Sequence, residues 1–260
     1  MIVASLYLIS TALFSVFAVV IGVRLIALSH RTKRLPERSL GLGFIGTAGL
    51  GYGLLMFGMV ARRAAGGDDA PEFYTSIVAL GWIFHNLGVM FMLDFVHRVF
   101  RPGVRWARLL KYALSGVLWG GWLADAFTGG LNASSQSLYY WITFSVIGTY
   151  PLWTAAEAIR YWKLMRKRVA LNLANPLVAN RFLLWTIASM STVASIWLVE
   201  VPTFLGFERM SAAAEHVTQI TMLWTSGFGI ATIGTYWLTF FPPTWYRARF
   251  RASFTCETES

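Results

Sequence analysis

Three tryptophans each lie three residues before a polar side chain within long apolar stretches of the sequence. The pairs are Trp82 with His85, Trp122 with Asp125 and Trp197 with Glu200. A spacing of three places both side chains on one face of a helix. An indole beside a carboxylate suits a cationic or aromatic ligand, through charge pairing and cation–π contact. If the three faces converge, the sequence predicts an aromatic-walled pocket, completed by Trp119 and Trp224.

The same tryptophans have a second interpretation that needs no ligand. The sequence holds 12 tryptophans, and tryptophan gathers at both membrane interfaces as an aromatic belt. A lone polar side chain inside a bundle also bonds one helix to another, which is worth about 0.6 kcal/mol on average. The sequence alone leaves both roles open for the three pairs.

His85 and Asn86 form the deepest polar pair that the sequence predicts. A single imidazole at mid-membrane can bind a carboxylate, relay a proton or ligate a tetrapyrrole. A haem held by two histidines needs a second imidazole at similar depth, whereas His30, His97 and His216 fall in a loop or near helix ends. Ligation by one histidine stays open, and the sequence identifies no cofactor.

Two further acidic residues are expected near the inner ends of apolar stretches. Asp94 precedes His97 and Arg98 by three and four residues, and Glu157 precedes Arg160 and Tyr161 in the same way. This spacing predicts local ion pairs at the inner membrane interface. The alternative is an inner gate that moves with the surrounding helices.

The elements that position these residues are predicted to be membrane helices. The chain has 260 residues, of which 56% are hydrophobic and 13% charged, against about 25% charged in soluble domains. A helix needs about 20 apolar residues to cross about 30 Å of hydrocarbon. Seven stretches reach that length, so the sequence predicts an all-α bundle of seven transmembrane helices. They cover residues 2–29, 40–60, 75–100, 109–128, 139–162, 181–207 and 217–241.

Basic residues predict the orientation of this bundle. Eighteen lysines and arginines fall on one side of the predicted membrane and three on the other. Cytoplasmic loops retain basic residues during insertion, so the amino terminus is expected outside and the carboxyl terminus in the cytoplasm. The bundle then occupies residues 1–241 and a short basic cytoplasmic tail occupies 242–260. Since the loops are too short for a separate catalytic domain, binding must occur among the helices.

Small residues and prolines predict how the helices pack. Gly49 and Gly53 form a small-xxx-small face that lets a neighbouring backbone approach. Pro151 and Pro202 are expected to kink the fifth and sixth helices. The connection over residues 163–180 is basic and apolar by turns, so it either lies on anionic lipid or docks a partner.

Two segments carry a resemblance to a known class of protein. They read Ala170-Leu-Asn-Leu-Ala-Asn-Pro-Leu-Val-Ala-Asn-Arg-Phe-Leu-Leu-Trp185 and Leu238-Thr-Phe-Phe-Pro-Pro-Thr-Trp-Tyr-Arg247. Both resemble the bacterial seven-helix membrane regions that precede histidine kinase and other signalling domains. The resemblance implies a sensor in the bacterial inner membrane. Since 13 residues follow Arg247, it also implies that the signal passes to a separate protein.

The remaining functional classes are weighed by the residues that they require. The net charge of +10 lies in short segments between apolar runs, which argues against nucleic acid as a partner. A retinal protein needs a lysine in its last helix, and none follows Lys167. Cys256 is the only cysteine, which excludes a cysteine metal site, and no paired-histidine metal motif or serine-histidine arrangement predicts an enzyme.

The sequence therefore predicts a receptor-like or sensory membrane protein that binds a small or lipid-borne ligand within its helices. Its expected partners are membrane lipids and a cytoplasmic signalling protein or membrane complex. Two alternatives stay open. One is a structural or cofactor-binding subunit of a membrane complex, and the other is a small-solute transporter, which needs a continuous polar pathway.

Overall fold

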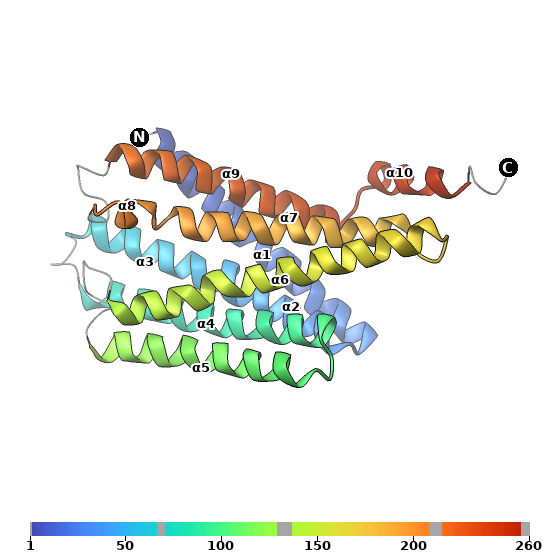
Figure 1. Cartoon of the computed structure of the whole chain (residues 1–260). Helices are drawn as coiled ribbons and strands as arrows, with labels where there is room; N and C mark the ends of the chain where they lie inside the picture. Colours follow the sequence, from blue (N-terminus) through green and yellow to red (C-terminus); the bar gives the residue numbers. More distant parts are fainter. Residues whose placement is uncertain (1, 67–70, 129–136, 208–214, 256–260) are drawn as a thin grey trace.

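The computed structural model describes residues 2–66, 71–128, 137–207 and 215–255, and within these ranges every regular element is a helix (Figure 1). The expectation of an all-α fold is confirmed. The long helices are α1 (Ile2–Thr32), α4 (Glu72–Phe100), α5 (Arg105–Phe127), α6 (Leu138–Ala170), α7 (Pro176–Leu198) and α9 (Glu215–Phe240). A seventh long helical rod is continuous over α2 (Leu35–Phe44), the π-helix η1 (Ile45–Gly51) and α3 (Tyr52–Ala64). The shorter helices are α8 (Val201–Phe204) and α10 (Thr244–Thr255).

The long helices pack side by side in chain order (Figure 1). Each contacts its neighbour in sequence, and α1 closes the ring against α9. Helix α5 lies at the edge of the bundle against α4 and α6, which also contact each other. The turns over residues 31–38, 98–111 and 160–181 gather at one end of the bundle, which we call the basic end because of their lysines and arginines. The amino terminus of α1 lies at the opposite end.

Helix α9 buries polar side chains and exposes apolar ones, the reverse of a helix on a water-soluble protein. Its buried residues all carry hydroxyls: Thr221, Thr225, Ser226, Thr232 and Thr239. By contrast, Ile220, Leu223 and Ile230 are each more than half exposed. The hydroxyls of Ser226, Thr232 and Thr239 donate to carbonyls four residues earlier, at 2.7–2.9 Å. Because these bonds stay within the helix, the hydroxyls can be buried while the apolar side chains face outward.

Four helical stretches are long and apolar enough to cross a membrane by length and composition. They are Ser5–Thr32, Leu35–Ala64, Glu72–Phe100 and Pro176–Leu198. Helices α5, α6 and α9 do not meet this measure within the described residues. Helices α6 and α9 are rich in hydroxyl-bearing side chains, which lower their hydropathy. In α5 the charged residues Arg105, Arg108, Lys111 and Asp125 lower it instead. The four stretches are consistent with a multi-pass membrane protein.

The α2–η1–α3 rod meets α4 backbone to backbone, because both carry glycine at the contact. A Cβ on Gly88 of α4 would lie 2.2 Å from the backbone nitrogen of Thr47, and one on Gly46 would lie 2.6 Å from the Cα of Gly88. Of the two glycines expected to form a close face, Gly49 closely approaches α1 but Gly53 has only loose contacts. The tightest approach therefore lies at η1, and π-helical segments of this kind are frequent at functional sites.

The predicted sixth helix over residues 181–207 is wrong in its limits. Helix α7 starts earlier, at Pro176, and ends at Leu198, and α8 follows after a turn at Val199 and Glu200. Pro202 occupies one of the first two positions of α8, where its missing N–H needs no partner within the helix. The proline thus falls at a break between two helices, which places Glu200 at an irregular point of the chain.

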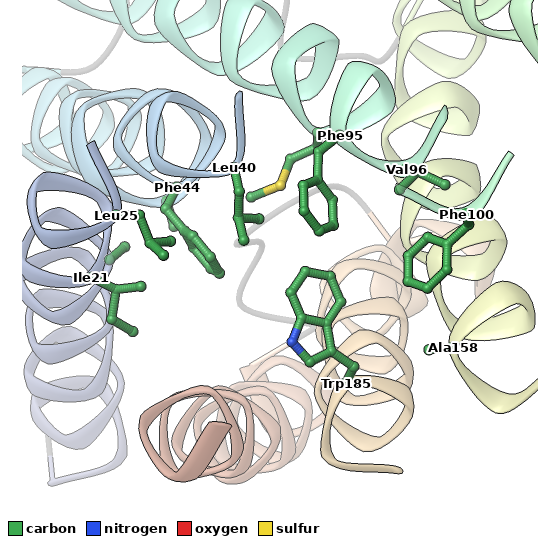
Figure 2. Packing of buried hydrophobic residues seen from close by; sticks show 12 residues of the cluster. Ile21, Leu25, Leu40, Phe44, Phe95, Val96, Phe100, Ala158 and Trp185 are labelled. Atoms are coloured by element: carbon green, nitrogen blue, oxygen red, sulfur yellow. The ribbon is translucent and has the colours of Figure 1, made fainter. Parts of the chain in front are cut away.

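A hydrophobic core with several aromatic rings lies in the half of the bundle nearer to the basic end, and Figure 2 shows its packing. Phe44, Phe95, Phe100 and Trp185 are buried and come from α2, α4 and α7. The ring centroids of Phe95 and Trp185 lie 5.0 Å apart, and that of Phe44 lies 4.8 Å from Tyr236 of α9. This core ties the bundle together at one end, and the opposite half contains the cavity described next.

Candidate functional site

A cavity of about 230 Å³ lies among the helices in the half of the bundle away from the basic end. Its lining comes from α1, the η1–α3 rod, α4, α6, α7 and α9, together with Glu200 between α7 and α8. Helix α5 contributes no lining residue. Most of the wall is carbon, from side chains such as Phe14, Met56, Met59 and Phe144. The cavity is smaller than the roughly 300–1,000 Å³ typical of drug-sized ligands, so it suits a smaller molecule.

Glu200 supplies the carboxyl group of the cavity lining. The residue is fully buried, and the hydroxyl of Tyr140 donates a hydrogen bond of 2.7 Å to its Oε1. The carboxyl comes from the break after α7, whereas Tyr140 lies in the first turn of α6. A buried carboxyl group is costly unless it is hydrogen-bonded, so this pair is the polar focus of the site.

His85 and Trp82 approach this focus from α4. The ring of Trp82 stands edge-on to His85, with centroids 5.9 Å apart, and edge-on to Tyr140 at 6.3 Å. Trp82 therefore lies between the imidazole and the phenol that binds Glu200. The Thr47 carbonyl of η1 faces His85, but neither ring nitrogen makes a hydrogen bond of normal geometry with the described residues.

Hydroxyl groups line the rest of the cavity. The hydroxyls of Tyr7 and Tyr52 lie 2.8 Å apart and join α1 to α3. The hydroxyls of Ser195 and Thr225, on α7 and α9, are buried and find no hydrogen-bond partner among the described residues. Buried polar atoms nearly always have a partner in native proteins, so a bound molecule or water is expected to bond them.

The structure brings three of the eight predicted site residues to the cavity and separates five from it. Trp82, His85 and Glu200 line the cavity. The five outside its lining are Asn86, Trp122, Asp125, Trp197 and Trp224. Trp119, expected in the walls, is also outside, and its indole N–H donates to the Met90 sulfur at 2.8 Å. Among the predicted site residues, only those of α4 and of the break between α7 and α8 therefore meet at the cavity.

The predicted residues outside the cavity have contacts of other kinds. Asp125 accepts a hydrogen bond from Ser137 and so connects the end of α5 to the start of α6. Trp197 packs against Gly148 and stands edge-on behind Phe144 of the cavity wall, with centroids 5.2 Å apart. Trp224 is 59% exposed on the outer face of α9. These positions favour the helix-bonding and lipid-facing roles for these residues.

Asn86 and Trp122 keep buried polar atoms without a partner among the residues that the structure describes. Both amide atoms of Asn86 and the indole nitrogen of Trp122 are of this kind. Asn86 is fully buried in α4, next in sequence to His85 but outside the cavity lining. The predicted polar pair is therefore divided between the cavity and the helix interface.

Several lining residues were missed because they belong to no motif. Tyr7, Tyr52 and Tyr140 come from three separate helices and present a polar tip on an aromatic body. The available signal was depth for Tyr7 and Tyr140, which lie near the ends of apolar stretches that the predicted topology places on the same side, whereas Tyr52 lies in the middle of its stretch. Depth alone does not say which tyrosines face inward.

At the basic end, the predicted ion pairs are partly confirmed. Arg98 Nε lies 2.6 Å from the Asp94 carboxylate, whereas the ring nitrogens of His97 have no hydrogen-bond partner in the described chain. Asp94 also receives hydrogen bonds from Ser39 at 2.8 Å and Lys111 at 3.1 Å. The carboxylate thus bonds α4 to α2 and α5.

Glu157 has a different main partner from the one predicted. Arg101, in the turn after α4, lies 2.6 Å from its carboxylate, while Arg160 lies 3.6 Å away and is largely exposed. Tyr161, the other predicted partner, donates instead to the Phe100 carbonyl at 3.3 Å. Glu157 therefore holds two helices together across the bundle.

The site has the character of a binding cavity. Within the described residues, no group of three histidine, cysteine, aspartate or glutamate side chains could hold a metal ion. Comparison of the chain with protein-family models, with curated proteins and with solved structures gives no match. The resemblance to the sensor regions of histidine kinases stays a prediction.

Proposed function

We propose that the protein is a sensory or receptor-like membrane protein that binds a small ligand in the cavity between its helices. The observation that carries the proposal is the cavity of about 230 Å³, at whose wall the buried hydroxyls of Ser195 and Thr225 have no hydrogen-bond partner among the residues that the structure describes. Groups of this kind fix the orientation of a ligand in a mainly apolar pocket. The expected location is the bacterial inner membrane.

We further propose that all seven rods cross the membrane, with the amino terminus outside and the carboxyl terminus in the cytoplasm. Helix α5 has 23 residues and α9 has 26, which correspond to about 35 and 39 Å and exceed the hydrocarbon thickness. Both expose apolar residues on their outer faces, among them Leu109, Val117 and Ile230. The basic residues gathered at one end support a cytoplasmic basic end.

The cavity wall favours a ligand with an aromatic or aliphatic body and one or two polar groups. The carbon wall accounts for the body, and the groups at Glu200, Tyr140 and His85 can bind an amine or an N–H donor. A protonated amine would meet aromatic faces as well as the carboxyl group. A neutral and a protonated ligand of the same shape would make the same apolar contacts, and they would differ in the charge that meets the aromatic faces and the carboxyl group.

A sensor is favoured over a transporter by the position of the aromatic core. The rings of Phe44, Phe95, Phe100 and Trp185 fill the bundle between the cavity and the basic end. A transported solute would need a polar route through this region, which these buried rings occupy. A ligand can instead act by shifting the helices that line its cavity.

The test uses indole and tryptamine, which share a ring system and differ in their charged group. Gly229 lines the cavity, and a Cβ there would meet no atom within 4 Å, so Gly229→Phe fills the cavity without a backbone clash. Gly234→Phe is the matched control on α9, because Gly234 also has open space but does not line the cavity. Binding is measured as thermal stabilisation of the protein in phosphatidylcholine nanodiscs.

A probe at 100 times its dissociation constant stabilises the folded protein by about 2.7 kcal/mol. We expect that stabilisation in the wild-type protein and in Gly234→Phe, and its loss in Gly229→Phe. Equal stabilisation of both variants would place the site elsewhere and contradict the proposal. If neither indole nor tryptamine binds to the wild-type protein, the proposed ligand chemistry is also contradicted.

A further inference from the structure

The hairpin formed by the end of α6 and the start of α7, residues 160–181, extends beyond the other turns of the basic end. Helix α6 has 33 residues and is therefore about 50 Å long, against about 30 Å of hydrocarbon. Figure 1 shows its turn into α7 farther out than the α1–α2 and α4–α5 turns. If α6 spans the membrane, roughly 20 Å of it remains to carry this hairpin arm away from the lipid.

The tip of the hairpin arm has a fixed conformation. The backbone N–H of Leu173 donates to the Arg168 carbonyl at 2.8 Å, and that of Asn172 donates to Val169 at 2.9 Å. Asn172 has a φ of 53°, so these bonds form a Schellman motif with asparagine in the left-handed position. The Asn175 side chain then caps the first turn of α7. Both helix ends are satisfied, and the tip presents its side chains in a defined arrangement.

The exposed surface of the hairpin arm combines positive charge with bare leucines. Leu171 is 68% exposed and Leu173 is 74% exposed. The exposed basic residues nearby are Lys163, Arg166, Lys167 and Arg168, and no acidic residue occurs from 158 to 181. Retention in the cytoplasm accounts for the basic residues but requires neither the leucines nor the projecting length. Apolar side chains bordered by polar or charged ones are the usual composition of a protein-binding surface.

We infer that the hairpin arm docks an acidic surface of a cytoplasmic signalling protein, with Leu171 and Leu173 as its apolar anchors. Charge complementarity selects an acidic partner, and the direction of the arm along the bundle axis favours a protein over the lipid surface. The signalling role of this contact rests on the proposed function, whereas the contact itself does not require a ligand.

Helix α10 joins the same surface, and α7 connects this surface to the cavity. The side-chain amide of Asn180 donates a hydrogen bond to the Tyr246 hydroxyl, so the start of α7 holds α10 beside the arm. Exposed Arg247 and Arg249 add positive charge there. Helix α7 lines the cavity near its other end, just before Glu200. A partner bound at the arm is thus in contact with a helix whose far end touches the ligand.

The test measures binding of a synthetic 18-residue helical peptide of glutamate, alanine and leucine to the protein in phosphatidylcholine nanodiscs, without ligand. A second peptide carries glutamine in place of glutamate. The hairpin variants are Leu171→Ser with Leu173→Ser, and Lys167→Glu with Arg168→Glu. Fluorescence anisotropy of the labelled peptide gives the dissociation constant.

The matched controls change the same charges and side-chain type on the α1–α2 connection. They are Arg31→Glu with Arg34→Glu, and Leu35→Ser, since all three residues are exposed at the basic end. We expect each hairpin variant to weaken binding of the acidic peptide at least tenfold, the controls to weaken it less than threefold, and the glutamine peptide not to bind.

Three results would overturn the inference. One is equal weakening by the hairpin and control variants, which would show nonspecific charge attraction. Another is failure of the wild-type protein to bind the acidic peptide.

The third contrary result is insertion of the arm into lipid. A bimane probe is attached at the exposed position Ala170 by Ala170→Cys, which leaves both leucines in place, and Cys256→Ser removes the native cysteine. Quenching of this probe in nanodiscs that contain brominated phosphatidylglycerol would show that the arm lies on the membrane. Since no ligand is present, failure of any of these measurements leaves the cavity test unaffected.

Discussion

Replacing Gly88 by alanine tests the close approach of α4 to η1. The new Cβ would lie 2.2 Å from the backbone nitrogen of Thr47 and 2.6 Å from the backbone carbon of Gly46. Backbone atoms cannot rotate away as a side chain can, so the two helices must separate. Inserting a carbon into a packed interface costs typically about 1–3 kcal/mol, while alanine improves the helix by about 0.5–1 kcal/mol over glycine.

The control for this change is Gly116→Ala on α5. Gly116 also lies inside a helix, but a Cβ there would meet no atom within 4 Å. Since both variants gain the same helix propensity, the difference between their free energies of unfolding isolates the contact at Gly88. We expect Gly88→Ala to be less stable than Gly116→Ala by about 1–3 kcal/mol.

Reversible unfolding in mixed micelles, followed by circular dichroism as dodecyl sulfate is added, measures this difference. The contact at Gly88 lies one helical turn after His85, so a separated α4 is also expected to weaken binding of the indole probes. Equal stability of the two variants would show that α4 does not approach η1 as closely as described, and the position of His85 in the cavity wall would lose its support.

The remaining predictions concern the basic end of the bundle. Arg101→Ala leaves the buried Glu157 carboxylate without its 2.6 Å partner and is expected to lower the free energy of unfolding by about 3 kcal/mol. Arg160→Ala removes an exposed partner at 3.6 Å and should change the free energy of unfolding by less than about 1 kcal/mol. Similar losses in the two variants would contradict Arg101 as the main partner of Glu157. Asn172→Val places a β-branched residue at a φ of 53°, and Asn172→Gly does not, so proteolysis within the hairpin tip should accelerate only in the valine variant.

The helices were predictable because an apolar stretch long enough to cross a membrane is a local property of the sequence. The limits of α7 were not, because the predicted apolar run continues through Pro202 while the backbone breaks at Val199 and Glu200. The π-helical segment η1 also leaves no pattern in hydropathy. Its glycine Gly46 allows the close approach to Gly88 of α4, and this contact between two helices cannot be seen in the sequence of η1 alone.

The site was predictable only in part, because spacing fixes which residues share a face but not how that face is turned in the bundle. Trp82 and His85 share a face of α4 that meets the cavity. Trp122 and Asp125 have the same spacing on α5, which lies at the edge of the bundle and lines no part of the cavity. Likewise, the closer partner of Glu157 is Arg101, 56 residues away, and not a neighbour on its own helix.

The buried hydroxyls of α9 have a mechanical consequence. Those of Thr232 and Thr239 are bonded to their own backbone, so they provide no directional attachment to the neighbouring helices. The bond from Ser10 to Ser226, at 3.1 Å, is an exception that fixes α9 to α1 near the cavity. Between that point and the tail, α9 is held by ring packing, with Tyr236 against Phe44 and Trp185 and Trp237 against Phe17, so any rotation that moves α10 must first repack these rings.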